Sequence, residues 1–146
     1  MAQTNAAKLY TPDVLALAVT LADFRLKHDS SHQADARSST CGSTITVGMD
    51  CDESGLIASI GLSVSACAIG QASAAIMAQN VIGRDQAWVR SRQNEIETWL
   101  SGAKPTPNIP SFDLLDTAKH YPARHGAILL PWRAVTAALS NEGSAS

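Results

Sequence analysis

The chain has 146 residues, of which 45% are hydrophobic, so it can bury one core of its own and has no length for a second domain. Charged residues make up 16% and the formal net charge is -2, which excludes the basic surplus typical of proteins that bind nucleic acid. Aromatic residues amount to only 5% while Ala is frequent. This composition favours close-packed helices over a barrel or sandwich of many strands.

The N-terminus has no secretory signal pattern, because residues 1–8 lack a basic region followed by an apolar core. We therefore expect a cytoplasmic protein, in which Cys41, Cys51 and Cys67 stay reduced as free thiols, metal ligands or sulfur-handling groups. The most apolar stretch, residues 64–82, is interrupted by Ser, Gln and Asn, which predicts a buried helix and excludes a membrane span.

The first predicted helix begins at Thr11-Pro12-Asp13, where Thr caps the free amides and Pro suits the first turn. Apolar residues at helical spacing extend it to about Lys27. Residues 28–40 are polar and small without an apolar period, so they predict an exposed loop. We expect His28 and His32 to be solvated in that loop.

A β-hairpin is predicted from residues 44–47 and 56–64, with turn-prone residues 50–55 between them. The second run is long enough to bend at Gly61 and supply a third strand. Cys51 is expected to be an exposed, incidental thiol in the turn. A small antiparallel sheet of this kind needs helices to cover one face.

Four more helices are expected after the sheet. They are Ala68 to Ile82 ending at Gly83, Asp85 to Leu100, a short helix capped by Ser111, and Gly126 to Leu139 with Pro131 near its first turn or at a kink. The sequence thus predicts one α+β domain in which a three-stranded antiparallel sheet packs against about five helices.

Two cysteines lie at predicted element boundaries. Cys41, followed by Gly42 and Ser43, ends the polar loop, and Cys67 begins a helix, where the positive end of the helix dipole favours a thiolate. Two thiolates at loop ends suggest a site for zinc or iron–sulfur, which needs four ligands. The chain has no closely spaced Cys pair, and a buried Cys entering an Ala-rich helix is also explained by core packing.

Four segments of the sequence resemble the U-type iron–sulfur cluster assembly scaffolds, the family of IscU, SufU and the N-terminal domain of NifU. They are Thr40-Cys41-Gly42-Ser43, residues 65–74 around Cys67, Tyr121-Pro122-Ala123-Arg124, and Leu130-Pro131-Trp132-Arg133-Ala134. The resemblance covers about residues 9–140 of a single domain spanning 1–146, and the last two segments are closest to the SufU branch.

The resemblance implies a site of three cysteines and one aspartate that holds a nascent cluster or zinc and receives sulfur from a cysteine desulfurase. Cys41 and Cys67 match two of these cysteines, and Cys41 is the candidate persulfide acceptor. Ser43 replaces the aspartate and is a candidate ligand in its place, while Ala127 replaces the third cysteine. His125, two residues before Ala127, is a candidate nitrogen ligand, and hydrogen bonding at a helix end is the alternative explanation for this histidine.

Two functional hypotheses follow. In the first, the chain is a scaffold or sulfur acceptor that works with a cysteine desulfurase and passes clusters to acceptor proteins. In the second, it is a degenerate relative that binds or regulates the assembly machinery without a metal site. A small helical domain with buried structural cysteines is the third possibility. No catalytic acid, base or triad is visible, so we expect no enzyme.

Overall fold

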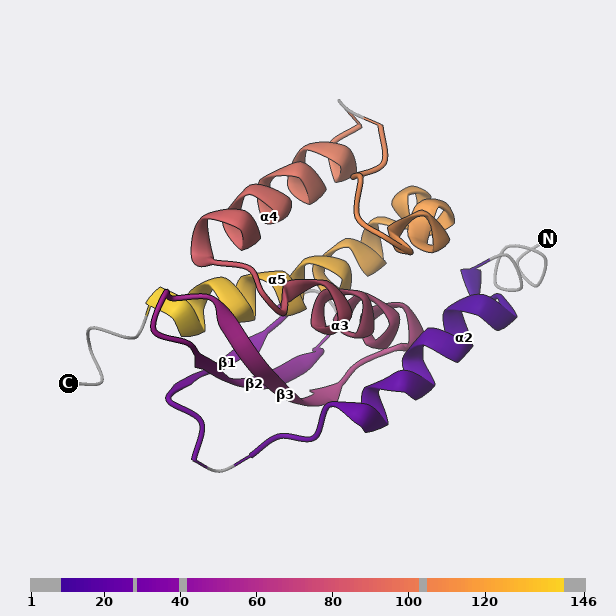
Figure 1. Ribbon diagram of the computed structural model, residues 1–146. Helices are drawn as coiled ribbons and strands as arrows, with labels where there is room; N and C mark the ends of the chain where they lie inside the picture. Colours follow the sequence, from indigo (N-terminus) through magenta and orange to yellow (C-terminus); the bar gives the residue numbers. More distant parts are fainter. Residues whose placement is uncertain (1–8, 28, 40–41, 103–104, 141–146) are drawn as a thin grey trace.

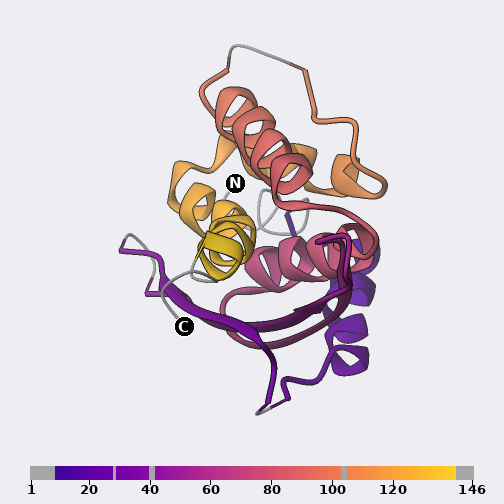
Figure 2. The same ribbon diagram turned by 60° about the vertical axis from the view of Figure 1, so that its left-hand side comes forward.

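The computed structural model describes residues 9–27, 29–39, 42–102 and 105–140. Three antiparallel strands form one sheet in the order β1 (His32–Arg37), β2 (Thr44–Cys51) and β3 (Ile57–Ser65). Helices α3 (Ala68–Val81) and α5 (His125–Ser140) cover one face of this sheet (Figures 1 and 2). The α+β class predicted from the sequence is confirmed.

The remaining helices pack against α3 and α5. Helix α2 (Pro12–Val19) packs on α3, and α4 (Gln86–Leu100) packs on α5. Between α4 and α5 the chain forms two 3₁₀ helices, η2 (Phe112–His120) and η3 (Pro122–Arg124). Figure 2 shows α4 on the far side of α5 from the sheet. The main core therefore lies between the sheet and the outer helices, around α3 and α5.

The predicted start of the first helix is confirmed, but its predicted end is wrong. Thr11 is the N-cap, and its Oγ1 accepts the Val14 backbone N–H at 3.2 Å. The α-helix ends at Val19 and is followed by a 3₁₀ turn, η1 (Thr20–Asp23). The Leu62 N–H then donates to the Phe24 carbonyl at 2.8 Å. This contact with β3 draws the chain out of the helix although the apolar spacing continues.

The predicted loop over residues 28–40 is also wrong, because β1 lies within it. His32 pairs with Met49 and Arg37 with Thr44. Burial alternates along the strand, but its inward residues are only one His and two Ala, which give almost no hydrophobic signal. His32 is 8% exposed and not solvated, while His28 lies outside the described residues.

β3 is one continuous strand, so the third strand comes from β1 and not from a bend at Gly61. Gly61 instead allows a close approach on the sheet face opposite the helices. A Cβ atom there would lie 2.2 Å from the backbone oxygen of Arg25. The segment that follows η1 thus packs directly against the backbone of the sheet.

Asp50 anchors the start of β1 to the end of β2. Its Oδ1 accepts the Ser31 backbone N–H at 2.9 Å and the Ser31 hydroxyl at 3.0 Å, and its Oδ2 accepts the Ser59 hydroxyl at 3.4 Å. The Ser31 backbone hydrogen bond, with smaller help from the two hydroxyls and Lys27, holds the pKa of Asp50 below its ordinary value, despite some desolvation.

A lowered pKa in the folded state makes this anchor dependent on pH. We expect its contribution to be complete at neutral pH and to be lost as the pH falls below about 4, through the folded pKa. Asp50→Asn should therefore be less stable than the wild type at pH 7, and the difference should shrink in acid. Urea unfolding of both proteins from pH 7 to pH 3 measures this, and a difference that stays constant contradicts it.

The helices after the sheet match the prediction to within one or two residues. Asp85 caps α4, where its Oδ1 accepts the Trp88 N–H at 2.9 Å, and Gly83 has φ +82 after α3. Ser111 is the N-cap residue of η2, as predicted, but its side chain makes no capping bond. Pro131 lies inside α5, in its second turn, so of the two predicted placements the first turn is wrong and a kink stays a prediction.

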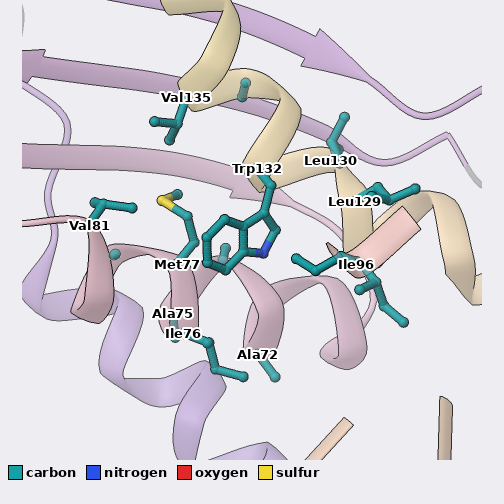
Figure 3. Packing of buried hydrophobic residues seen from close by; sticks show 14 of the residues in the cluster. Ala72, Ala75, Ile76, Met77, Val81, Ile96, Leu129, Leu130, Trp132 and Val135 are labelled. Atoms are coloured by element: carbon teal, nitrogen blue, oxygen red, sulfur yellow. The ribbon is translucent and has the colours of Figure 1, made fainter. Parts of the chain in front are cut away.

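The core is centred on small and aliphatic residues of α3 that face α5. Figure 3 shows Trp132 of α5 between Met77 and Ile96, close to the Ala residues of α3. Trp132 is fully buried, and its ring stands 6.4 Å from that of Trp88. Close packing of α3 against α5 fixes the relative position of the two helix N-termini. The candidate functional site described below lies at these N-termini.

Candidate functional site

Cys67 is the N-cap residue of α3, as the sequence predicted. Its backbone is extended, with φ -66 and ψ 169, and its side chain is half-buried against the core without a capping bond. The Cys67 carbonyl accepts the Gln71 N–H at 2.9 Å, and the Gln71 side-chain amide donates to the Ala66 carbonyl at 3.0 Å. The thiol is thus held on a rigid strand-to-helix junction.

Position 127, where the resemblance implies a third cysteine, lies beside the first turn of α3. A Cβ atom added to Gly70 would lie 2.8 Å from the Cβ of Ala66 and 3.2 Å from the Cβ of Ala127. The Ser73 hydroxyl, one turn further along α3, donates to the Ile128 carbonyl at 2.7 Å. The N-terminal parts of α3 and α5 therefore meet at this end of the molecule (Figure 1).

Ser43 lies at the same end of the sheet as Cys67. Thr44 pairs with Ser65, so the residues just before β2 and just after β3 are neighbours. Ser43 is 4% exposed, and its carbonyl accepts the Ser38 N–H at 2.8 Å. Gly42 has φ +71, the left-handed conformation that a tight turn requires. Cys41 lies outside the described residues.

His125 is the first residue of α5 and is half-buried. Its Nε2 lies 2.7 Å from the Lys119 carbonyl. Because a carbonyl can only accept, Nε2 carries the proton in the neutral ring and Nδ1 carries the lone pair. The role of His125 as a ligand stays a prediction. The atom that would bind the metal is Nδ1, because it carries the lone pair.

One contact at this end was not predicted. The Arg124 side chain donates to the Tyr10 hydroxyl at 3.1 Å and so ties η3 to the residue that precedes the N-cap of α2. Arg124 belongs to one of the segments that carry the resemblance, but neither spacing nor burial pattern indicates that residues so far apart in the sequence make contact.

The candidate ligands among the described residues do not by themselves form a metal site. Among them, no group of three or more His, Cys, Asp and Glu side chains is arranged to hold a metal ion. Neither α3 nor α5 has an acidic residue in its first turn. The positive ends of two helix dipoles therefore converge there without a carboxylate from either first turn, which favours anionic ligands such as thiolates and sulfide.

Cys51 is far from this end of the sheet and is not in the exposed turn that we expected. It is the last residue of β2, half-buried and packed against the core. It lines a cavity of about 460 Å³ together with His32 and three acidic residues, Asp52, Glu53 and Asp85. Sequence reasoning missed this grouping because β1 was not predicted.

Within the described parts of the chain, no helix has the length and apolar character needed to cross a membrane. Neither a protein-family model nor a curated protein matches the sequence. Solved structures with a similar fold do match the chain. The N-terminal part of a nitrogen-fixing NifU-like protein from Brucella abortus has a TM-score of 0.85 and 27% identity, covering 97% of this chain and 99% of that one.

A second solved structure is a candidate iron–sulfur cluster assembly scaffold protein for the SUF system from Fervidobacterium islandicum. It has a TM-score of 0.79 and 22% identity, covering 91% of this chain and 98% of that one. Both structures span nearly the whole of this chain. The chain therefore has the U-type scaffold fold of NifU-like N-terminal domains and SUF-system scaffolds, as its sequence motifs predicted.

Proposed function

We propose that this protein is an iron–sulfur cluster assembly scaffold or sulfur acceptor that works with a cysteine desulfurase and delivers clusters to acceptor proteins. The observation that supports this best is the near-complete match to the NifU-like structure together with a cysteine at the N-cap of α3. The proposed role is that of a carrier and not of an enzyme.

The chemistry at this end of the molecule suits a cargo that is held loosely. Cys67 offers a sulfur ligand from the strand-to-helix junction, and the ends of α3 and α5 favour the negative charge of sulfur ligands. Cys41 is the proposed second thiolate, and His125 Nδ1 the proposed nitrogen ligand. Ser43 and Ala127 give no strong ligand. We therefore expect the site to hold either a labile cluster or, instead of a cluster, a zinc ion.

Anaerobic reconstitution tests this proposal. The reduced full chain is incubated with ferrous iron and sulfide, desalted, and examined by its visible absorption and iron content. We expect a cluster chromophore in the wild type, little or none in Cys67→Ser and Cys41→Ser, and a partial loss in His125→Ala.

The matched control is Cys51→Ser, which removes the thiol at the other end of β2 and should leave the chromophore unchanged. Equal loss in Cys51→Ser and Cys67→Ser would mean that iron is bound unspecifically. Absence of any chromophore or bound metal in the wild type contradicts the carrier role.

The replacement of two ligands, by Ser43 and Ala127, favours one alternative. In it, the chain keeps the docking surface of the scaffold fold without a metal site and acts as a binding or regulatory partner. A desulfurase assay separates the two proposals. Under the alternative, the protein binds the desulfurase or changes its rate equally well with and without Cys67, whereas sulfur transfer to the scaffold requires a cysteine.

A further inference from the structure

The outer edge of β1 offers backbone groups for pairing with a further strand. β1 is the last strand of the sheet and pairs with β2 on its other side. The Ser38 N–H donates to the Ser43 carbonyl at 2.8 Å, one pair beyond the strand, so every second residue counted back from Ser38 bonds to β2. The N–H and carbonyl groups of Asp35 and Arg37 therefore point away from β2, and no described residue bonds to them.

The side chains along this edge carry opposite charges. Asp35 and Arg37 lie two residues apart and so on one face of the sheet, opposite the face on which Ala34 and Ala36 pack against the core. Both are exposed, and neither forms an ion pair within the described parts of the chain. Asp35 Oδ1 accepts the Thr46 hydroxyl at 2.7 Å, which fixes the carboxylate but leaves its charge unbalanced.

We propose that two copies of this chain form a symmetric dimer by pairing their β1 strands antiparallel, which joins the two sheets into one. A two-fold axis makes every contact occur twice. With the axis at Ala36, Asp35 of each copy lies opposite Arg37 of the other. The outward backbone groups of residues 35 and 37 then bond to each other across the edge.

Charge selects this register over its neighbours. A shift of one strand by two residues places Asp35 opposite Asp35 or Arg37 opposite Arg37, and like charges directly opposite destabilise a strand pair. A single charge on an edge strand keeps identical copies apart, because each copy brings the same charge. Two opposite charges at this spacing attract in one antiparallel register. The partner that the edge matches is therefore a second copy of this chain.

The position of α5 is compatible with such a dimer. α5 packs over β1 and β2, at the side of the molecule where the sheet ends (Figure 2). Strands lie about 4.8 Å apart, so the two β1 strands would be about 5 Å apart and the two β2 strands about 14 Å apart. A helix above the middle of β1 and β2 then lies about 10 Å from its equivalent, a normal distance for packed helices. The dimer would thus bury part of α5 as well as the edge.

Sedimentation of the reduced full chain from micromolar to millimolar concentration tests the proposal. We expect a dimer that forms with rising concentration. Arg37→Asp and Asp35→Arg each place like charges opposite each other twice, so each variant alone should dimerise at least about tenfold more weakly. An equimolar mixture of the two should associate about as tightly as the wild type, because every pair again joins opposite charges. Arg90→Asp, an exposed position of α4, is the matched control and should leave the dimer unchanged.

Ala36→Cys tests the register. In the proposed pairing, residue 36 opposes its equivalent with Cα atoms about 4.5 Å apart, within the range of a disulfide. The two residues 34 are offset along the strands by about 13 Å. Oxidation of Ala36→Cys should therefore give a dimer linked between the two residues 36, identified by peptide mass spectrometry. Ala34→Cys, oxidised in parallel, should give no link between the two residues 34.

Three results would overturn the proposal. One is a wild type that stays monomeric at millimolar concentration, including the case in which another protein covers the edge. Another is a dimer that Arg37→Asp leaves unchanged, and the third is a mixture of the two variants that associates no better than each alone. Loss of cluster binding would leave the proposal standing, because the dimer is independent of the proposed scaffold role and is measured without metal.

Discussion

Gly61→Ala is expected to be among the most damaging single substitutions in the sheet, lowering the free energy of unfolding by about 3 kcal/mol or more. The added Cβ would lie 2.2 Å from the Arg25 carbonyl oxygen and 2.8 Å from the Leu26 Cα. These are backbone atoms, so no side-chain rotation relieves the clash. The segment after η1 must move off the sheet and give up the Leu62 N–H to Phe24 carbonyl bond.

Two matched variants calibrate this loss. Gly48, the partner of Gly61 across β2 and β3, would place its Cβ 2.8 Å from the Ser30 hydroxyl oxygen, a side-chain atom that can move. Gly48→Ala should therefore cost less than Gly61→Ala. Ser63→Ala, at an exposed position of β3, should change stability by no more than about 0.5 kcal/mol. Urea unfolding that ranks Gly61→Ala with Ser63→Ala contradicts the close approach.

Restoring the two replaced ligand positions should produce the largest gain of function. We expect the double variant Ser43→Asp with Ala127→Cys to bind an iron–sulfur cluster more tightly than the wild type and to keep it on desalting. Ala127 lies against the first turn of α3, one turn from Cys67, and Ser43 lies at the same end of the sheet. The variant would supply two further anionic donors, giving the four that a cluster needs.

The single variants and a third change separate ligand chemistry from altered packing. Ala127→Ser adds a side chain of similar size without a thiol and should give no gain. Adding Cys67→Ser to the double variant should remove the gain. The retained chromophore and the iron to sulfide ratio after gel filtration are the measurements. A double variant that folds, keeps its thermal stability and holds no more cluster than the wild type contradicts the assignment of this end as the site.

Helix positions could be predicted from the sequence because their signals are local. Pro12 after a capping Thr, Asp85 before α4 and Gly83 after α3 each act within one turn of the residue concerned. Only the first helix ended elsewhere than predicted, where Phe24 bonds to β3. A contact of that kind depends on residues almost forty positions away and leaves no local pattern.

The sheet was less predictable. The inward face of β1 consists of His32, Ala34 and Ala36, whose apolar surface is too small to produce an alternating pattern. It is a strand because the better-patterned β2 offers a free edge for pairing. Once β1 was missed, the burial of His32 and its place near Cys51 could not be inferred.

For the candidate site, the boundary position of Cys67 followed from local signals, whereas the approach of Ala127 to Gly70 did not. Only the resemblance to the U-type scaffolds placed residues 67 and 127 at one site. A family resemblance implies which positions lie together in the folded protein, and local sequence signals do not. The structure agrees on their proximity through the close packing of α3 and α5.

The measurement that tests the scaffold proposal most directly is the iron, zinc and acid-labile sulfide content of the full chain purified without oxygen, beside Cys67→Ser and Cys51→Ser. We expect metal in the wild type and in Cys51→Ser, and its loss in Cys67→Ser. Metal-free wild type, or metal retained in full by Cys67→Ser, would contradict the proposal that this protein carries its cargo at the N-terminal end of α3.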